Sequence, residues 1–413
     1  MTVNSNCRIC KSNNLLPVID LGKQPLANAF LRADELDNPE QRFPLVVYLC
    51  ANCNLAQLVH VVSKELLFSD YIYFSSGMPR LSDHFKKYAE DVINKFLKTP
   101  GDFVVEMGSN DGILLQFFKE KKFRVLGVDP AKNIAMIAQT RGVPTVADFF
   151  SSALAEDIVQ KHGKAKAILG NNVVAHINDY DDLCAGVKTL LSPDGVFVFE
   201  APYLADMFEN LAFDTIYHEH LSYLSVRPLK YLFAKFGLEI FDVKIVQAQG
   251  QSIRVFVGHK GAHSLGSGVE QCADKEIALG LNNPDAYRVL CKKISQTKND
   301  VVNTLKRLKN QQKRLAAYGA PAKGNTVLNY YNIGTDLLDF ALDDLPSKQG
   351  LYTPGARLPV VARSFALEHA PQYYFLLAWN YLPVILEKEK DYLRGGGAFI
   401  LPTGNIIRES VLN

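Results

Sequence analysis

The 413-residue sequence lacks the features that mark secreted, membrane-spanning and nucleic-acid-binding proteins. Residues 1–6 have no apolar core of a signal peptide. The best membrane candidate, residues 374–386, is too short to span a bilayer and is interrupted by Asn380 and Pro383. The formal net charge is only +2, and the lysines are spread along the chain instead of forming a basic block. We therefore expect a cytoplasmic protein with neither a membrane nor a nucleic acid as partner.

The hydrophobic pattern predicts an α/β protein with more than one domain. Apolar residues make up 48% of the chain and charged residues 21%, as in ordinary globular proteins. Short apolar segments alternate with helical patterns, which predicts a mostly parallel sheet covered on both faces. After a polar helix expected over residues 285–315, the pattern starts again and predicts a smaller α/β domain. Strands are expected at 103–106, 124–129, 144–146, 167–169, 195–200, 338–342, 358–360, 373–377 and 398–400.

The seven cysteines need an explanation other than disulfides, which are rare in the cytoplasm. Cys7-x-x-Cys10 and Cys50-x-x-Cys53 form two knuckles. Four thiolates presented by two tight turns make a closed tetrahedral site for structural Zn²⁺. A redox pair and four unrelated thiols are the alternatives. The other cysteines lack partners at ligand spacing and are interpreted as buried small hydrophobes: Cys184, Cys272 and Cys291.

A strand, a glycine-containing loop and a helix start follow one another at residues 104–115. Gly108 and Gly112 permit unusual backbone dihedrals, and Glu106 can accept hydrogen bonds from an ammonium group. The spacing differs from the dinucleotide fingerprint Gly-x-Gly-x-x-Gly. About twenty residues on, Asp129 ends the next strand, where a carboxylate binds ribose hydroxyls in doubly wound folds. The loop resembles the S-adenosylmethionine loop of class I methyltransferases.

Further polar residues are expected at the carboxyl ends of the same parallel strands, where ligands collect. Asp148 and Phe149 are candidates for the adenine ring, and Asn171 and Asn172 for the methionine portion or the substrate. Each also has an interpretation as a helix cap or turn residue. The cofactor-binding candidates are Glu106, Gly108, Asn110, Asp111, Gly112, Asp129, Pro130, Asp148, Phe149, Asn171 and Asn172.

The segment Tyr217-His218-Glu219-His220-Leu221-Ser222-Tyr223 is the richest in acid–base groups. It is not a His-Glu-x-x-His metalloprotease helix, because the second histidine would fall at Ser222. Together with His176 at another strand end, the cluster indicates catalysis. The sequence does not choose between His218 and His220 as a base, since alternation along an extended segment would put both on one side.

The carboxyl-terminal region offers groups for a polar ligand. Residues 318–326 are not a Walker A loop, but a glycine-bounded loop that opens a helix and carries Lys323 is a plausible anion site. A turn with a solvated lysine is the alternative. The loops at 348–355, 378–380 and 395–397 are also rich in ligand-binding groups. The substrate-binding candidates are Lys323, Asn325, Tyr352, Trp379 and Asn380.

Taken in order, these motifs resemble the zinc-containing, S-adenosylmethionine-dependent sugar C-methyltransferases. The resemblance covers essentially the whole chain. It implies a zinc-binding domain at 1–70, a class I methyltransferase domain with a doubly wound sheet at 71–265, and a Rossmann-like α/β domain at 266–413 that helps to hold a nucleotide-sugar. It also implies methylation of carbon 3 of a nucleotide-linked 4-keto-6-deoxyhexose, typically a dTDP sugar.

The resemblance assigns His220 as the base, with Tyr217 and Glu219 beside it and His176 and Tyr71 as further active-site groups. A ketone next to carbon 3 makes its C–H bond acidic enough to break, and nearby donors would stabilise the enolate. Two other classes of function stay open: a sugar O- or N-methyltransferase, and a non-catalytic nucleotide-sugar-binding protein. The sequence leaves the sugar, the nucleotide, the stereochemistry and the choice between monomer and homodimer undecided.

Overall fold

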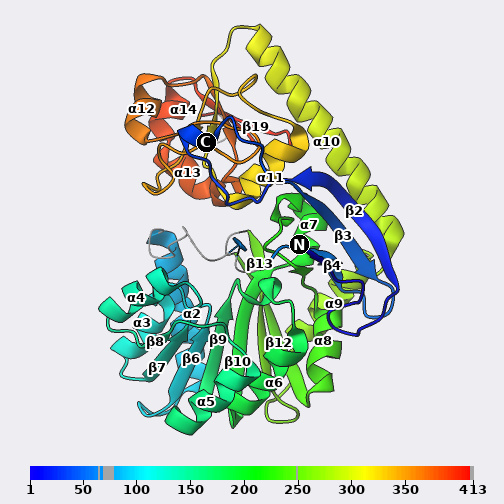
Figure 1. The fold of residues 1–413 in the computed structure, drawn as a ribbon, viewed down its shortest axis with the longest axis vertical. Helices are drawn as coiled ribbons and strands as arrows, with labels where there is room; N and C mark the ends of the chain where they lie inside the picture. Colours follow the sequence, from blue (N-terminus) through cyan, green and yellow to red (C-terminus); the bar gives the residue numbers. More distant parts are fainter. Residues whose placement is uncertain (64–65, 68–78, 248–249, 410–413) are drawn as a thin grey trace. The chain divides into compact units, whose positions relative to one another are not determined.

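The computed structural model describes residues 1–63, 66–67, 79–247 and 250–409, which form two compact units that interleave along the chain (Figure 1). Unit 1 contains Met1–Leu16, Tyr48–Asp206 and Glu219–Asn283, and unit 2 contains Pro17–Val47, Met207–His218 and Pro284–Asn413. The chain therefore crosses from unit 2 to unit 1 between His218 and Glu219, inside the segment richest in acid–base groups. The division into three sequence domains stays a prediction.

Unit 1 is built on a seven-stranded sheet. In spatial order its strands are β12 (Leu238–Gln247), β13 (Gln251–His259), β10 (Leu191–Pro202), β9 (Ala165–Asn171), β6 (Phe103–Met107), β7 (Arg124–Val128) and β8 (Thr145–Val146). β10, β9, β6, β7 and β8 are parallel, and β13 and β12 add an antiparallel edge. The expected mostly parallel sheet is confirmed. The carboxyl ends of the five parallel strands meet at one edge of the sheet.

Helices cover both faces of this sheet (Figure 1). On one face, Tyr88 and Leu114 from two helices pack with Val104 and Val198 of the strands in one buried cluster. On the other face, the Phe233 ring lies 6.3 Å from the ring of Phe197. The helices are α2 (Pro79–Phe96), α3 (Ile113–Glu120), α4 (Lys132–Thr140), α5 (Ser152–His162), η3 (Val174–His176), α6 (Tyr180–Leu190), α8 (Val226–Lys235) and α9 (Gly268–Ala278), and α7 (Leu204–Asn210) is shared by the two units.

Short strands tie the amino terminus of unit 1 to the segment after His220. β4 (Ala56–Leu58) pairs antiparallel with β11 (Ser222–Tyr223), and β1 (Thr2–Val3) pairs with β5 (His60–Val61). The second cysteine knuckle comes just before β4 in the chain, so the knuckle and the segment after His220 are held in a common framework.

Unit 2 contains a six-stranded sheet. Its strands, in spatial order, are β16 (Val360–Val361), β15 (Ala341–Leu342), β14 (Leu315–Tyr318), β17 (Tyr373–Leu376), β18 (Ala398–Ile400) and β19 (Ile406–Ile407). All neighbours are parallel except β18 and β19. Unit 2 also contains most of β2 (Leu15–Gln24) and β3 (Phe43–Cys50), with η1 (Ala33–Glu35), η4 (Phe213–Thr215), α10 (Pro284–Asn310), α11 (Ala322–Tyr331), α12 (Arg363–Glu368), η5 (Trp379–Tyr381), α13 (Leu382–Lys388) and α14 (Lys390–Arg394).

The boundaries of some elements differ from the expectation. The helix expected over 285–315 ends at Asn310, and the next residues turn into β14. The strand expected at 338–342 is confined to Ala341–Leu342, and the Leu338 N–H closes a turn onto the Gly334 carbonyl. Within the described residues, none of the helices has both the length and the apolar character needed to cross a membrane.

Candidate functional site

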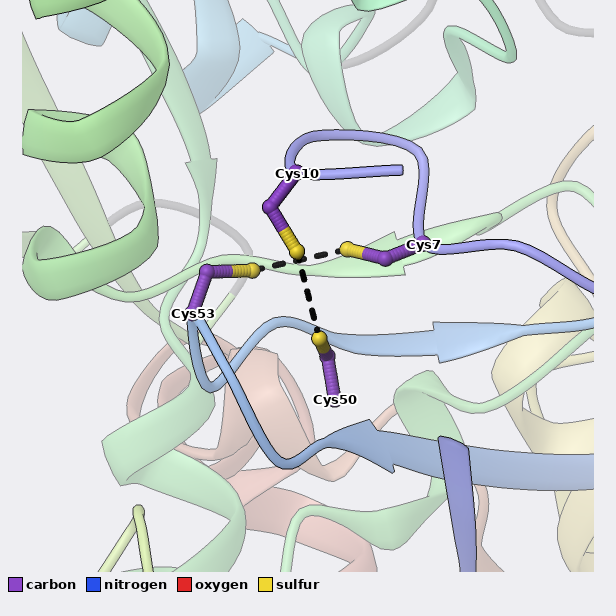
Figure 2. Close-up of side chains that lie close together, drawn as sticks. All are labelled: Cys7, Cys10, Cys50 and Cys53. Atoms are coloured by element: carbon purple, nitrogen blue, oxygen red, sulfur yellow. Dashed lines mark hydrogen bonds between the residues drawn. The ribbon is translucent and has the colours of Figure 1, made fainter. Parts of the chain in front are cut away.

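The four knuckle cysteines converge on one point in unit 1 (Figure 2). Their sulfur atoms all lie within 4.8 Å of one another. Each knuckle is closed by a backbone hydrogen bond, from Lys11 to Cys7 and from Asn54 to Cys50, and the residues that close them, Lys11 and Asn54, adopt positive φ. Four sulfur ligands at this spacing fit a tetrahedral Zn²⁺ ion.

The contacts inside the cluster lower the pKa of one thiol and raise that of its partner. The contact with Cys53, whose Sγ lies 3.4 Å from that of Cys7, lowers the pKa of the Cys7 thiol to about 5 and raises the pKa of Cys53. Zinc binds thiolates, so binding of the ion would release the protons that the other thiols of the cluster hold. A four-cysteine site leaves no open position for water or substrate, which makes its role structural.

The loop between β6 and α3 has the backbone geometry expected of a cofactor loop. Gly108, Asn110 and Gly112 have φ values of 64°, 47° and 79°. A Cβ atom on Gly108 would lie 3.1 Å from Val173 side-chain atoms. Glycine at 108 and 112 therefore permits both the left-handed conformation and the close packing of this turn.

Glu106 lies at the carboxyl end of β6 with only 2% of its surface exposed. Its Oε1 atom accepts a hydrogen bond of 3.2 Å from Asn171 Nδ2, while Oε2 has no hydrogen-bond partner among the residues that the structure describes. Burial raises the pKa of Glu106 well above its ordinary value. A buried carboxylate of this kind fits the ammonium group of an amino-acid ligand, which would supply both a donor and a counter-charge.

Asp129 lies at the end of the next strand and is also buried. Its Oδ2 accepts from the Asn110 N–H at 2.9 Å and its Oδ1 from the Ala131 N–H at 3.0 Å. Burial raises the pKa of Asp129 as well. Each oxygen retains acceptor capacity, which suits ribose hydroxyls. Pro130 follows Asp129 directly and is half-buried.

The remaining cofactor candidates lie at the same edge in different environments. Asp111 is fully buried and pairs with Arg141 at 2.9 Å, so part of its charge is compensated inside the protein. Asp148 is exposed after β8 and accepts a hydrogen bond from the N–H of Phe149. Asn172 adopts a φ of 54°, and its N–H donates to the Glu200 carbonyl.

Two histidines of unit 1 lie together beyond the carboxyl ends of β9 and β10. The His176 and His220 ring centroids are 5.1 Å apart, with 38° between the ring planes. Burial lowers the pKa of His176 to about 4, which leaves this imidazole neutral at physiological pH. Glu219 and His220 are both buried.

His218 has different surroundings, in unit 2. Its Nε2 lies 3.2 Å from the Phe43 carbonyl, and the two rings meet edge to face. Residues Tyr217 to Glu219 form a bend and a turn instead of an extended segment, so the expected alternation does not apply to them. Tyr71 lies outside the described residues.

The substrate candidates of unit 2 differ in their surroundings. Lys323 Nζ is 3.8 Å from Asp214 Oδ1 and 5.1 Å from the centre of the Trp379 ring, and Trp379 Nε1 donates to Asp214 at 2.7 Å. Asn325 is buried and donates to the Ala27 carbonyl. The others have no such cluster: Tyr352 is half-buried and forms backbone bridges with Leu31 and Pro359, and Asn380 lies half-buried in η5.

One buried charge cluster at the edge of the unit 1 sheet was not expected from the sequence. Glu200 at the end of β10 is 2.7 Å from His84 Nε2 and 2.7 Å from the Arg254 guanidinium. The strand end was evident from the sequence pattern. Its partners come from a helix and an antiparallel strand far away in the chain, and no local spacing indicates them.

Three family models match successive parts of the chain. A zinc binding domain matches residues 7–68, a methyltransferase domain 81–243, and a C-methyltransferase C-terminal domain 247–403. The C-methyltransferase NovU from Streptomyces niveus is 37% identical over 397 residues, which cover 96% of this chain and 94% of NovU.

Solved structures of methyltransferases also match part of the chain, at low identity. Magnesium protoporphyrin IX methyltransferase (ChlM) from Synechocystis PCC 6803 is 13% identical, with 43% of this chain and 83% of that chain covered and a TM-score of 0.34. A S-adenosylmethionine-dependent methyltransferase from Clostridium acetobutylicum ATCC 824 is 15% identical, with 44% and 91% covered and a TM-score of 0.34. At these TM-scores neither structure bears on the reaction.

The similarity to NovU extends over nearly all of both chains, and the family models divide it into a zinc-binding part and methyltransferase parts. The four-cysteine cluster is the zinc site, unit 1 has the class I methyltransferase fold, and S-adenosylmethionine is the methyl donor. The chain belongs to the zinc-containing, S-adenosylmethionine-dependent C-methyltransferase family.

Proposed function

We propose that the protein transfers a methyl group to carbon 3 of a nucleotide-linked 4-keto-6-deoxyhexose, with dTDP as the expected nucleotide, in the biosynthesis of branched-chain deoxysugars. The pair formed by His176 and His220, next to a cofactor edge that carries Glu106, is the observation that carries the proposal. Carbon methylation needs a base for a C–H bond and a donor for the enolate oxygen, and two adjacent imidazoles supply both.

His220 is the proposed base. It takes the proton from carbon 3, and the electron pair delocalises onto the oxygen of the 4-ketone. His176 is neutral because burial lowers its pKa to about 4, and its imidazole N–H would donate to the enolate oxygen. Tyr217 and Tyr71 are proposed as further donors, and Glu219 as the residue that orients His220. His218 lies against the Phe43 carbonyl, which favours His220.

Glu106 and Asp129 would hold S-adenosylmethionine by its ammonium group and its ribose, and the other candidates at the strand ends complete that site. When bound, S-adenosylmethionine supplies an electrophilic methyl group for the carbanion. The protein contributes alignment and electrostatics. The four cysteines would hold the zinc ion with no open position for substrate, so we assign it no part in the chemistry.

Lys323 is proposed to bind a phosphate of the nucleotide, with Asn325, Tyr352, Trp379 and Asn380 around the rest of the substrate. Lys323 lies at the amino-terminal turn of α11, where backbone N–H groups also favour an anion. We further propose the domain division 1–70, 71–265 and 266–413, a cytoplasmic location, and a monomer or homodimer as the working form.

Product analysis tests this function. The protein is incubated with methyl-¹³C S-adenosylmethionine and a dTDP-4-keto-6-deoxyhexose, and the product is analysed by carbon–proton correlation NMR. We expect the labelled methyl on carbon 3. A methyl on oxygen or nitrogen would make the protein a sugar O- or N-methyltransferase, and binding of the sugar without any transfer would favour a nucleotide-sugar-binding role.

A further inference from the structure

Arg8 stands between the zinc ligands Cys7 and Cys10, yet only 2% of its surface is exposed. Its Nε donates to Asn178 Oδ1 at 3.1 Å, and its Nη1 donates to Gln57 Oε1 at 3.2 Å and to the Leu58 carbonyl. The Arg8 backbone N–H also donates to Gln57 Oε1. A buried guanidinium that satisfies acceptors from two distant segments fixes their separation.

The first of these segments carries His176. Asn178 lies in the short loop between η3 and α6, two residues after His176. The same knuckle contacts the start of α6 through an ion pair of 2.9 Å between Lys11 and Asp181. The Tyr180 hydroxyl in turn donates to the Val174 carbonyl at 3.0 Å. The knuckle therefore contacts the loop that follows His176 at one point and the start of α6 at another.

The second segment carries His220. Gln57 and Leu58 belong to β4, in which Gln57 pairs with Ser222 of β11. The Leu58 N–H donates to the carbonyl of Leu221, the residue directly after His220, at 2.9 Å. The Arg8 side chain thus contacts both segments that carry the histidine pair. All these residues belong to unit 1.

We propose that Arg8 is a positioning residue through which the zinc knuckle sets the relative placement of His176 and His220. The proposal rests on the catalytic roles proposed for these histidines. It gives the zinc centre a purpose beyond local folding: the ion fixes the knuckle, the knuckle fixes Arg8, and Arg8 holds the two histidine segments. Four thiolates around Zn²⁺ also carry net negative charge, which complements a buried arginine.

The test compares Arg8→Met, Arg8→Lys and the exposed control Arg42→Met in the full-length, zinc-loaded protein. Zinc stoichiometry is measured first, and then the side-chain NMR signals of ¹⁵N-histidine-labelled protein, assigned with His176→Asn and His220→Asn. We expect Arg8→Met to retain zinc, to shift the signals of both histidines, and to lower kcat about 10- to 100-fold with little change in the KM of the sugar. Arg8→Lys should recover part of kcat, and Arg42→Met should match wild type.

Zinc-loaded Arg8→Met with unchanged histidine signals and unchanged kcat would overturn the proposal. If Arg8→Met loses zinc or fails to fold, the variant Asn178→Ala tests the proposal instead. It removes one hydrogen-bond acceptor of Arg8 and leaves the knuckle intact. A shifted His176 signal in that variant supports the proposal, and an unchanged one refutes it. The NMR comparison needs no sugar, so it still tests Arg8 if the proposed substrate is wrong.

Discussion

Replacement of Glu106 by glutamine should weaken the binding of S-adenosylmethionine without weakening the fold. The variant keeps the shape of the side chain and removes the charge that we assign to the ligand's ammonium group. A hydrogen bond to a charged group contributes about 1.5–3 kcal/mol. The Kd measured by calorimetry at pH 8 should therefore rise by about 10- to 150-fold. The exposed carboxylate Glu120, on α3, gives the matched control Glu120→Gln.

Stability and binding should depend on pH in opposite ways at Glu106. Burial raises its folded-state pKa above the ordinary value of 4.5, so the folded protein binds this proton more tightly than the unfolded chain. The free energy of unfolding therefore falls as the pH rises above the pKa that Glu106 has in the unfolded chain. Glu106→Gln has no such ionisation and should not lose this stability. At pH 8 the variant should be at least as stable as wild type in the absence of ligand.

Ligand affinity should follow the ionised carboxylate. Wild-type Kd should increase as the pH is lowered toward the raised pKa of Glu106, and the Kd of Glu106→Gln should change much less with pH. Equal Kd values for the two proteins at pH 8, with Glu120→Gln also unchanged, would refute the assignment of Glu106 to the ammonium group.

Three other predictions concern the zinc site, the ribose and the phosphate. Cys50→Ser should lose zinc in metal analysis and should unfold at a lower temperature. The control Cys291→Ser should keep the zinc content and the unfolding temperature of wild type. A zinc-free variant as stable as wild type would contradict a structural role. Asp129→Asn should raise the Kd of S-adenosylmethionine about tenfold, because an amide cannot accept from both backbone N–H groups and also from the ribose. An unchanged Kd would exclude Asp129 as a ligand of the ribose. Lys323→Met should raise the KM of the nucleotide-sugar about tenfold or more in steady-state assays and leave the Kd of the cofactor unchanged. The control is Lys313→Met, at an exposed lysine. Equal KM values for Lys323→Met and wild type would place the phosphate elsewhere.

The sequence was sufficient to predict the elements whose pattern is local. Around Gly108 an apolar β-branched run leads into a glycine-containing turn and then a helical pattern, and the structure has β6, the loop and α3 there. Parallel strands share an edge, so Glu106 and Asp129 were expected at the same edge and are found there. The four cysteines were grouped by knuckle spacing alone, and the structure brings their sulfur atoms together.

Features that depend on distant pairing were not accessible from the sequence. The short strand β4 is recognisable by its pairing in the sheet, with β11 among its neighbours, and Arg8 looks like any polar residue between two cysteines. The same holds for Glu200 and His84, which are in contact in the structure although the sequence near either residue does not predict the other. The sequence left His218 and His220 undecided because an extended segment would put both on one side; the structure turns at 217–219 and gives them different surroundings.

Hydrogen exchange at carbon 3 of the ketosugar tests the central claim most directly. Wild type, His220→Asn and His218→Asn are incubated with the dTDP-4-keto-6-deoxyhexose and S-adenosylhomocysteine in D₂O, and deuterium at carbon 3 is measured by NMR against an enzyme-free blank. The zinc content and S-adenosylhomocysteine affinity of each variant are checked beforehand. Our account predicts deuterium incorporation with wild type and His218→Asn and blank-level exchange with His220→Asn. Exchange by His220→Asn at the wild-type rate would contradict it.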